Sequence, residues 1–342
     1  MPRNSCTYKI SGTKTFRLSS CKILGQWGSN TQNIEKSMRQ QYIPDDGKIF
    51  VQVDCAGAEA LIVAYLCKKG NLRDLFINGI KIHTYVALHL FKDIWVKKLR
   101  EHSMLISEGF NIDEMIATPI NKLKFHPDWL QVNTIIKASD DWSLQERYYY
   151  LAKQTAHSSN YGIEAPTFRM NILEKSGGKI IIKKEEAERF LQTYHSLFPE
   201  IKEWHGIIRR QVEMTNMLFN CHGHPYTITT YNLLESAWKE LYSWIPQSSV
   251  GMICNIAYSN MAKYIETENL AWDLLSNCHD SYLLQCPIGE EVECARVARL
   301  FIEQEFISPV DGAKFRMGSE AKVGYNWSNY KKETNELGLK DL

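Results

Sequence analysis

Residues 49–53, Ile-Phe-Val-Gln-Val, alternate between aliphatic side chains and side chains of other kinds. A period of two is typical of a β-strand that buries one face. Asp54 follows at the end of the strand, and a carboxylate on a rigid strand is well placed to bind a metal ion. The competing interpretation is a plain strand-to-helix corner in which Asp54 caps the next helix, and taken alone this commoner arrangement is favoured.

A helix is predicted directly after this strand, because Gly57 interrupts the alternation and residues 58–66 are largely apolar, with Glu59 in the first turn. Residues 92–140 are mixed and indicate no particular chemistry. Elsewhere the patterns predict helices at residues 71–78, 82–91, 145–159, 184–197, 199–217, 232–242, 247–266 and 289–305, hairpins at 218–228 and 270–286, and a final strand within 314–327.

The predicted helix at 145–159 carries a possible ligand-binding face. Lys153, His157 and Tyr161 follow one another at intervals of four residues, so they share one face if the helix continues. Such a face can bind a charged ligand that contains a ring. An ordinary solvated face is an equally good interpretation from this spacing alone.

A second carboxylate is predicted at the tip of the hairpin at 270–286, where His279 and Asp280 occupy the turn. Asp54 and Asp280 are far apart in the sequence, so only the fold can bring them together. If they converge, they can hold two divalent metal ions, an arrangement that serves phosphoryl transfer. Mg²⁺ suits a site with two carboxylates because substrate phosphates complete its ligands.

The first 47 residues are polar and rich in turn formers, with Arg17 among several hydroxyl side chains. Such a stretch cannot bury a core of its own, and it suits either contacts with phosphate and sugar or a plain surface arm. The whole chain of 342 residues has a net charge of +1, so a basic groove must be local.

Nine cysteines without a C-x-x-C pair indicate reduced thiols and no zinc framework. The N-terminus has no apolar signal region, and no apolar run approaches the length that spans a membrane. We therefore expect a cytoplasmic protein of ordinary globular composition with no membrane partner.

An ordered set of short motifs resembles the polymerase module of family A DNA polymerases, the bacterial DNA polymerase I type, and above all its phage branch. The resemblance extends over residues 12–327. The motifs are residues 12–20 (G-T-x-T-G-R-L-S-S, with Phe16 in place of Gly), 30–33 (N-L-Q-N), 54–61 (motif A), 81–83 (D-I-H), 149–162 (motif B), 246–248 (P-Q-S), 279–281 (motif C, H-D-E) and 323–327 (V-G-x-N-W).

By this resemblance the chain is an α+β protein, a right-hand palm with an antiparallel sheet and helices, joined to helical fingers. It implies an N-terminal arm at residues 1–43 that packs on the palm, a palm formed by residues 44–61 and 218–342, and fingers formed by residues 62–217. The implied reaction is template-directed addition of deoxynucleotides to a primer 3′ end, in phage or mobile-element replication.

The resemblance also implies roles for individual residues. Asp54 and Asp280 would bind two Mg²⁺ ions, with Mn²⁺ as an alternative, and would be catalytic together with Lys153. Deoxynucleotide binding would involve Glu59, His83, Lys153, His157 and Tyr161, with Glu59 excluding a ribose 2′-OH. Primer and template would contact Arg17, Gln32, Lys239, Gln247 and His279.

The sequence departs from the family pattern at several of these motifs. Tyr149 stands where motif B has Arg, and Ser281 replaces the last carboxylate of motif C. Gly57 and Leu61 replace the usual Gln and Arg of motif A. Lys239 stands where Arg is usual, which keeps the charge but loses the bidentate geometry.

The family usually carries a thumb, and often an exonuclease, before residues that correspond to 12–20. We therefore expect either a separate thumb and exonuclease polypeptide, or another replisome subunit, or a chain that is a fragment. If the chain is phage-encoded, it would act in the host cytoplasm. An alternative function is a non-catalytic polymerase-like subunit that binds primer-template or scaffolds a replisome. A ribonucleotide-using polymerase is disfavoured by Glu59.

Overall fold

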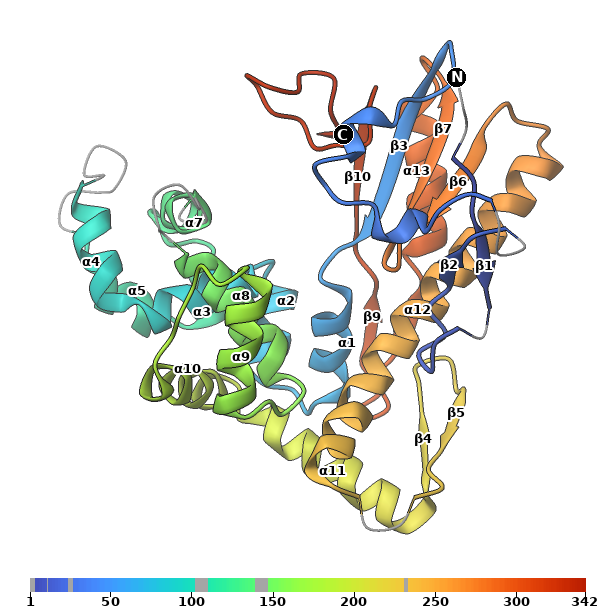
Figure 1. Ribbon diagram of the computed structural model, residues 1–342. Helices are drawn as coiled ribbons and strands as arrows, with labels where there is room; N and C mark the ends of the chain where they lie inside the picture. Colours follow the sequence, from blue (N-terminus) through green and yellow to red (C-terminus); the bar gives the residue numbers. More distant parts are fainter. Residues whose placement is uncertain (1–3, 11, 24–26, 102–109, 139–146, 231–232) are drawn as a thin grey trace.

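The computed structural model describes residues 4–10, 12–23, 27–101, 110–138, 147–230 and 233–342. A β-sheet backed by helix α13 (Glu291–Ile302) stands at one end of the molecule, and both chain termini lie at that end (Figure 1). A group of helices lies on the opposite side of the molecule from the sheet, at the left in Figure 1. The long helix α12 (Glu235–Thr267) runs obliquely from the lower part of the molecule up to the side of the sheet.

Strand β3 (Lys48–Cys55) occupies the middle of a five-stranded sheet with the order β11-β10-β3-β7-β6. Every neighbouring pair is antiparallel. The other strands of the sheet are β6 (Asp273–Asn277), β7 (Ser281–Pro287), β10 (Ser319–Gly324) and β11 (Lys340–Asp341). In this register Asp54 lies opposite Ser281 on one side and Glu320 on the other.

The two faces of β3 contact different cores, as the alternation in the sequence predicts. Val51 and Val53 are fully buried in the main core, which also takes in α12 and α13. Phe50 points to the opposite face, into a small second core with Leu283, Trp327 and Leu339. Gln52 and Asp54 continue along that second face, so the small core leads directly to the predicted carboxylate.

Helices fill the chain between β3 and α12. They are α1 (Ala58–Leu66), α2 (Asn71–Ile77), α3 (Ile82–Leu90), α4 (Lys92–Glu101), α5 (Ile112–Ala117), α6 (Ile120–Leu123), α7 (Trp129–Ala138), α8 (Tyr148–Ser159), α9 (Ala165–Lys175), α10 (Lys184–Leu197) and α11 (Glu200–Thr215).

Most of the predicted elements are confirmed, including the hairpin formed by β4 (Met217–Phe219) and β5 (Pro225–Thr227), which turns at Gly223 with φ +76°. The predicted helix at 145–159 is described only from residue 147 onward, and it begins at Tyr148.

Two predictions of element boundaries are wrong. The helices expected at 232–242 and 247–266 form the single helix α12, and Pro246 lies inside it. Tertiary packing overrides the local cost of an interior proline, because this stretch is buried. The strand expected within 314–327 is interrupted at Gly318, giving β9 (Lys314–Arg316), which pairs with β8 (Glu305–Ile307), and β10, which pairs with β3.

The N-terminal segment lies along β6 and α12. Its described elements are β1 (Thr7–Lys9), β2 (Ser19–Cys21), η1 (Thr31–Asn33) and η2 (Arg39–Gln41). The Tyr8 hydroxyl accepts a hydrogen bond from the Asn277 amide at 2.9 Å, and Asn255 of α12 donates to the Phe16 carbonyl at 2.7 Å. A Cβ added at Gly251 would lie 2.5 Å from the Thr15 oxygen, so the two backbones approach closely.

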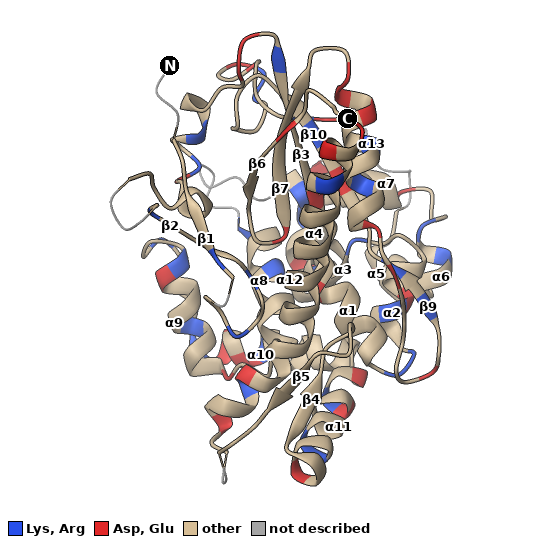
Figure 2. Ribbon diagram, turned by 90° about the vertical axis from the view of Figure 1, so that its right-hand side faces the viewer, with Lys and Arg blue, Asp and Glu red and all other residues tan. Residues whose placement is uncertain are grey.

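Acidic and basic residues are interspersed over the helices (Figure 2), in keeping with the small net charge. All nine cysteines fall within the described residues, and each is a free thiol. Among those residues no helix is both long enough and apolar enough to span a bilayer.

Candidate functional site

The two carboxylates that the sequence singles out lie at the same end of two neighbouring strands. Asp54 is near the end of β3, and Asp280 is the last residue of the turn before β7. The Cys55 amide donates to the Asp280 carbonyl at 2.9 Å, which fixes the turn beside the strand. Asp54 does not cap α1, because the N-cap position of that helix is Gly57 and it has no side-chain capping bond. The capping interpretation of Asp54 is therefore wrong.

The turn that carries Asp280 is tightly constrained. His279 has a φ of +68°, a left-handed conformation that non-glycine residues adopt at a cost. The Asp280 amide donates to the Cys278 carbonyl at 2.9 Å, and the Asn277 side chain accepts from the His279 amide at 3.2 Å. Among the described residues, Nδ1 of His279 is buried and has no hydrogen-bond partner.

The carboxylate pair fits a divalent cation. Partial burial raises the pKa of Asp280, and the nearby Asp54 carboxylate adds to that shift, although the Asp280 side chain is still exposed on one side. A cation bound nearby would relieve the repulsion between two like charges. The part of the chain that is described contains no cluster of three His, Cys, Asp or Glu side chains. Substrate phosphates and water would complete the ligands, which Mg²⁺ accepts.

Three further predicted residues form a connected group near these carboxylates. Nη2 of Arg17 lies 2.5 Å from Oε1 of Glu59, and both side chains are about one-fifth exposed. The other Glu59 oxygen accepts a hydrogen bond from the Tyr161 hydroxyl. Burial, followed by the Glu59 charge, raises the pKa of Tyr161 well above its usual value, so the phenol stays protonated and donates.

A second group of predicted residues gathers around α8. Lys153 and His157 lie one turn apart on its exposed side, and the His157 ring stands 5.6 Å from the Tyr161 ring. Burial, followed by the Lys153 charge, lowers the pKa of His83 to about 4, so this imidazole is neutral near pH 7. Tyr161 itself lies beyond the end of α8, so the shared face expected from the spacing includes only Lys153 and His157.

The remaining predicted DNA contacts are more scattered. Lys239 of α12 lies 3.6 Å from Glu164, just after motif B. Gln247 is half-buried one turn before Gly251, where the N-terminal segment crosses α12. Gln32 is buried, and its amide accepts from the Ser20 backbone at 2.8 Å and donates to the Leu18 carbonyl at 2.9 Å. Its side chain is thus committed within the chain, and its contact with DNA stays a prediction.

The departures from the family pattern have local explanations. Gly57 adopts a left-handed conformation with φ +59° at the start of α1, which favours glycine. Leu61, in place of Arg, is buried in the main core. Phe16, in place of Gly, keeps a left-handed φ of +59° while its ring stacks on His224 at 4.7 Å. Tyr149, in place of Arg, packs edge-on against His83 at 5.9 Å.

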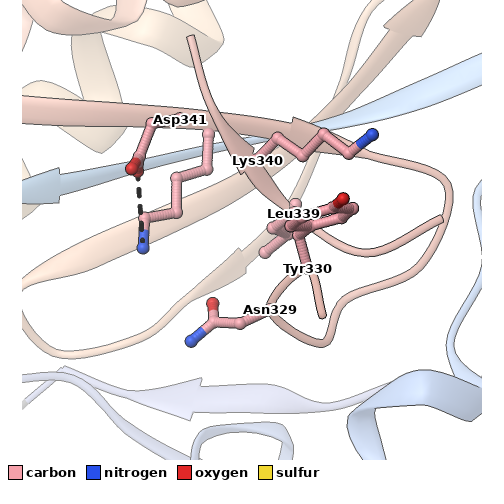
Figure 3. A pocket seen from close by; sticks show the side chains of 6 residues that line it. Asn329, Tyr330, Leu339, Lys340 and Asp341 are labelled. Carbon is pink, nitrogen blue, oxygen red and sulfur yellow. Dashed lines mark ion pairs between the residues drawn. The ribbon is translucent and has the colours of Figure 1, made fainter. Parts of the chain in front are cut away.

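A pocket of about 440 Å³ lies elsewhere, at the β10–β11 edge of the sheet (Figure 3). Its Lys322 lies 3.7 Å from Asp341, and its Lys340 lies 4.3 Å from the centre of the Tyr330 ring. Both cations therefore have partners inside the pocket, and none of the predicted site residues lines it.

Sequence reasoning missed one residue of the site, Gln52. Its side-chain nitrogen lies 3.1 Å and 2.9 Å from the two carboxylate oxygens of Asp54. The signal was present in the alternation, since residues two apart on a strand point to the same face. The pairing of Arg17 with Glu59 was also missed, because no spacing in the sequence relates them.

No protein-family model matches the chain. Curated proteins that it resembles include DNA polymerase I of Borreliella burgdorferi, 24% identical over 290 residues, which covers 81% of this chain and 26% of that protein. DNA polymerase I of Caldicellulosiruptor bescii is 22% identical over 332 residues, covering 94% of this chain and 31% of that protein. DNA polymerase I of Geobacillus stearothermophilus is 23% identical over 304 residues, covering 85% of this chain and 27% of that protein.

Among solved structures, the chain matches the POL domain of Pol1 from M. smegmatis in complex with DNA primer-template and dNTP. The TM-score is 0.64 at 18% identity, and the match covers 94% of this chain and 47% of that one. The resemblance to family A DNA polymerases and the α+β polymerase fold are therefore confirmed. The chain spans about a quarter to a third of the length of the curated relatives that it matches.

Proposed function

We propose that this relative of DNA polymerase I is a template-directed DNA polymerase module that adds deoxynucleotides to a primer 3′ end. The observation that carries the proposal is that Asp54 on β3 lies beside Asp280, the last residue of the turn that leads into the adjacent strand β7. Glu59 lies near these carboxylates and accepts a hydrogen bond from the Tyr161 hydroxyl. A pair of carboxylates beside a residue suited to sugar selection supports nucleotidyl transfer over a purely structural role.

In this proposal Asp54 and Asp280 hold two divalent cations, Mg²⁺ or alternatively Mn²⁺. When bound, such ions supply Lewis-acid stabilisation of the attacking and departing oxygens of an in-line phosphoryl transfer. Lys153 contacts the triphosphate as a point charge, and neutral His83 and exposed His157 accompany it. These three side chains orient the nucleotide from α3 and α8, while the two carboxylates stay fixed on the sheet.

Sugar selection is assigned to Glu59. Its carboxylate is held from both sides, by Arg17 at 2.5 Å and by the Tyr161 hydroxyl. A side chain held in this way cannot swing aside to make room for a ribose 2′-OH. Deoxyribose lacks that hydroxyl and avoids the conflict.

Primer and template are proposed to lie against Arg17, His279, Lys239 and Gln247, with Gln32 supporting the segment that carries Arg17. Such contacts go mainly to phosphate and sugar, so binding should weaken as salt rises.

The biological setting completes the proposal. A motif B of the form His-x-x-Asn-Tyr-Gly supports replication of phage or mobile-element DNA. The proposed partners are primer-template DNA and deoxynucleotides, which the structural neighbour holds. The proposed compartment is the cytoplasm, that of the host if a phage encodes the chain.

Primer extension tests the function. We expect Asp54→Asn and Asp280→Asn to lower Mg²⁺-dependent incorporation by at least about 10²-fold, because each removes a charge that faces the metal site. Asp341→Asn, an exposed carboxylate on the β11 edge of the same sheet, is the matched control. Wild-type activity in either folded site variant would refute the proposal.

The alternative is a non-catalytic polymerase-like subunit that binds primer-template or scaffolds a replisome. The observation in its favour is that Tyr149, which replaces the triphosphate-binding Arg, packs on His83. Assays of primer-template binding and of primer extension by the chain decide between the two. Binding of primer-template without incorporation would favour the alternative.

A further inference from the structure

Gln52 and Asp54 point to the same face of β3, two residues apart. The amide nitrogen of Gln52 lies 2.9 Å from Oδ2 and 3.1 Å from Oδ1 of Asp54. One NH₂ group therefore donates to both oxygens of the carboxylate. A carboxylate held at both oxygens cannot rotate freely about its last bond.

Trp327 determines which end of the Gln52 amide faces Asp54. The indole Nε1 of Trp327 lies 2.8 Å from Oε1 of Gln52. An indole N–H can only donate, so the amide oxygen must face Trp327 and the NH₂ group must face Asp54. The orientation of this amide, which is often ambiguous, is fixed here by the chemistry of its neighbours.

Trp327 is itself immobilised. Its side chain is 3% exposed and belongs to the small core with Phe50. Its backbone N–H donates to the Tyr42 carbonyl at 3.0 Å, and the Arg39 guanidinium lies 4.5 Å from the ring centre. The hydrogen-bonded series from Trp327 through Gln52 to Asp54 thus begins at a fixed point of the fold.

We propose that Gln52 is a positioning residue that presents the Asp54 carboxylate to a divalent cation, with Trp327 holding the amide in its working orientation. The proposal rests on the proposed function, because it takes Asp54 as a metal ligand. It adds a residue of this chain that the family motifs do not include.

The amide is well suited to this task because it is neutral. A Lys or Arg at residue 52 would also hold the carboxylate, but its charge would oppose a cation. Each carboxylate oxygen can accept more than one hydrogen bond or ligand. The Gln52 NH₂ group therefore leaves acceptor capacity on both Asp54 oxygens for a cation and keeps their full negative charge.

Direct titration with Mn²⁺ tests the proposal without relying on catalysis. Electron paramagnetic resonance of free Mn²⁺ gives the affinity of the full chain in the absence of DNA and nucleotide. We expect Gln52→Met to weaken Mn²⁺ binding by about 10-fold or more, because loss of a group that orients a ligand typically has that effect. Trp327→Phe keeps the ring but removes the N–H, and we expect a smaller loss in the same direction.

Gln285 provides a matched control on the neighbouring strand β7. Its amide also donates to carboxylates, those of Asp45 at 2.8 Å and Asp273 at 2.9 Å, but neither belongs to the candidate site. Gln285→Met should therefore leave Mn²⁺ affinity unchanged. If Gln52→Met alone fails to fold, the double variant Gln52→Met/Trp327→Phe removes the orphaned indole donor, and Trp327→Phe gives an independent result.

Unchanged Mn²⁺ affinity in folded Gln52→Met, or in the double variant, would overturn the positioning role. Asp54→Asn separates this failure from failure of the proposed function. If Asp54→Asn also binds Mn²⁺ as the wild type does, Asp54 is not a metal ligand. If Asp54→Asn loses binding and the Gln52 variants retain it, only the role of Gln52 is wrong.

Discussion

The Arg17 guanidinium, from the N-terminal segment, lies 2.5 Å from the Glu59 carboxylate at the start of α1. One residue expected to contact DNA is therefore paired with the residue expected to select the sugar. Both side chains are largely buried, so removing one partner leaves a poorly solvated charge.

We expect Arg17→Met to lower the free energy of unfolding by about 1–3 kcal/mol, because Glu59 then keeps only Tyr161 as a partner. Urea denaturation of Arg17→Met, Glu59→Gln and the double variant measures the coupling. The double variant should be less destabilised than the sum of the single variants. Strict additivity would mean that the ion pair contributes nothing to stability.

Sugar discrimination should depend on Glu59 more than on Tyr161. Glu59→Ala removes the obstructing side chain, and we expect the preference for dNTP over rNTP to fall by about 10- to 10²-fold. Tyr161→Phe leaves Glu59 held by Arg17, so the loss should be smaller. Single-nucleotide incorporation with matched dNTP and rNTP measures both ratios. Equal use of the two substrates by the wild type would refute the role of Glu59.

Phe16 combines a left-handed backbone with ring stacking on His224. Both Phe16→Ala and Phe16→Gly lose the stacking, but only glycine relieves the backbone cost of about 1–2 kcal/mol. We therefore expect the glycine variant to be about 1 kcal/mol more stable than the alanine variant. Thermal denaturation monitored by circular dichroism checks the order, and an alanine variant of higher stability would contradict it.

Two helical glycines should respond in opposite ways to alanine. A Cβ at Gly251 of α12 would lie 2.5 Å from the Thr15 oxygen, so Gly251→Ala should lower the unfolding free energy by about 1–3 kcal/mol. The nearest atom to a Cβ at Gly206 of α11 is a flexible Arg210 nitrogen at 3.6 Å, so Gly206→Ala should stabilise by about 0.5–1 kcal/mol. Limited proteolysis of the first 20 residues should accelerate only in the Gly251 variant.

Stability should fall as the pH drops from about 6.5 to 4. In the folded chain the pKa of His83 is about 4, whereas an unfolded histidine titrates near 6.5. On acidification the histidine of the unfolded state therefore takes up its proton first. The free energy of unfolding then falls by up to about 1.4 kcal/mol per pH unit. His195 and His205 have pKa values lowered to about 4 in the same sense. Urea titrations across this range should give a shallower slope for His83→Asn than for the wild type.

Local patterns predicted many of the elements, but they did not predict the helices α4 to α7 and α9, or the contacts between elements. The alternation at 49–53 predicted β3, and its two faces follow directly from the side chains. Pro246 signalled a helix start, yet the buried surroundings keep α12 continuous. The burial of Gln32 against the Ser20 backbone had no signature in its own motif.

In the candidate site, too, local patterns identify single residues but do not predict the contacts between them. The adjacency of Asp54 and Asp280 could be expected only from the family resemblance, because no periodic pattern relates strands so far apart in the chain. Gln52 could have been recognised from its place on the strand, since it shares a face with Asp54. The hydrogen bond from Trp327 that orients the Gln52 amide could not be predicted from the sequence, because only the fold brings the C-terminal motif beside β3.

The position of β3 between β7 and β10 also sets an order of events during synthesis. β3 leaves the ribosome early, but both strands that flank it follow after residue 280. The helices from α1 to α11 can form from local contacts in the meantime, whereas the sheet must wait for partners from the end of the chain. The carboxylate pair is therefore among the last features to assemble, and a nascent chain halted before residue 281 exposes an apolar strand with neither neighbour to cover its edges.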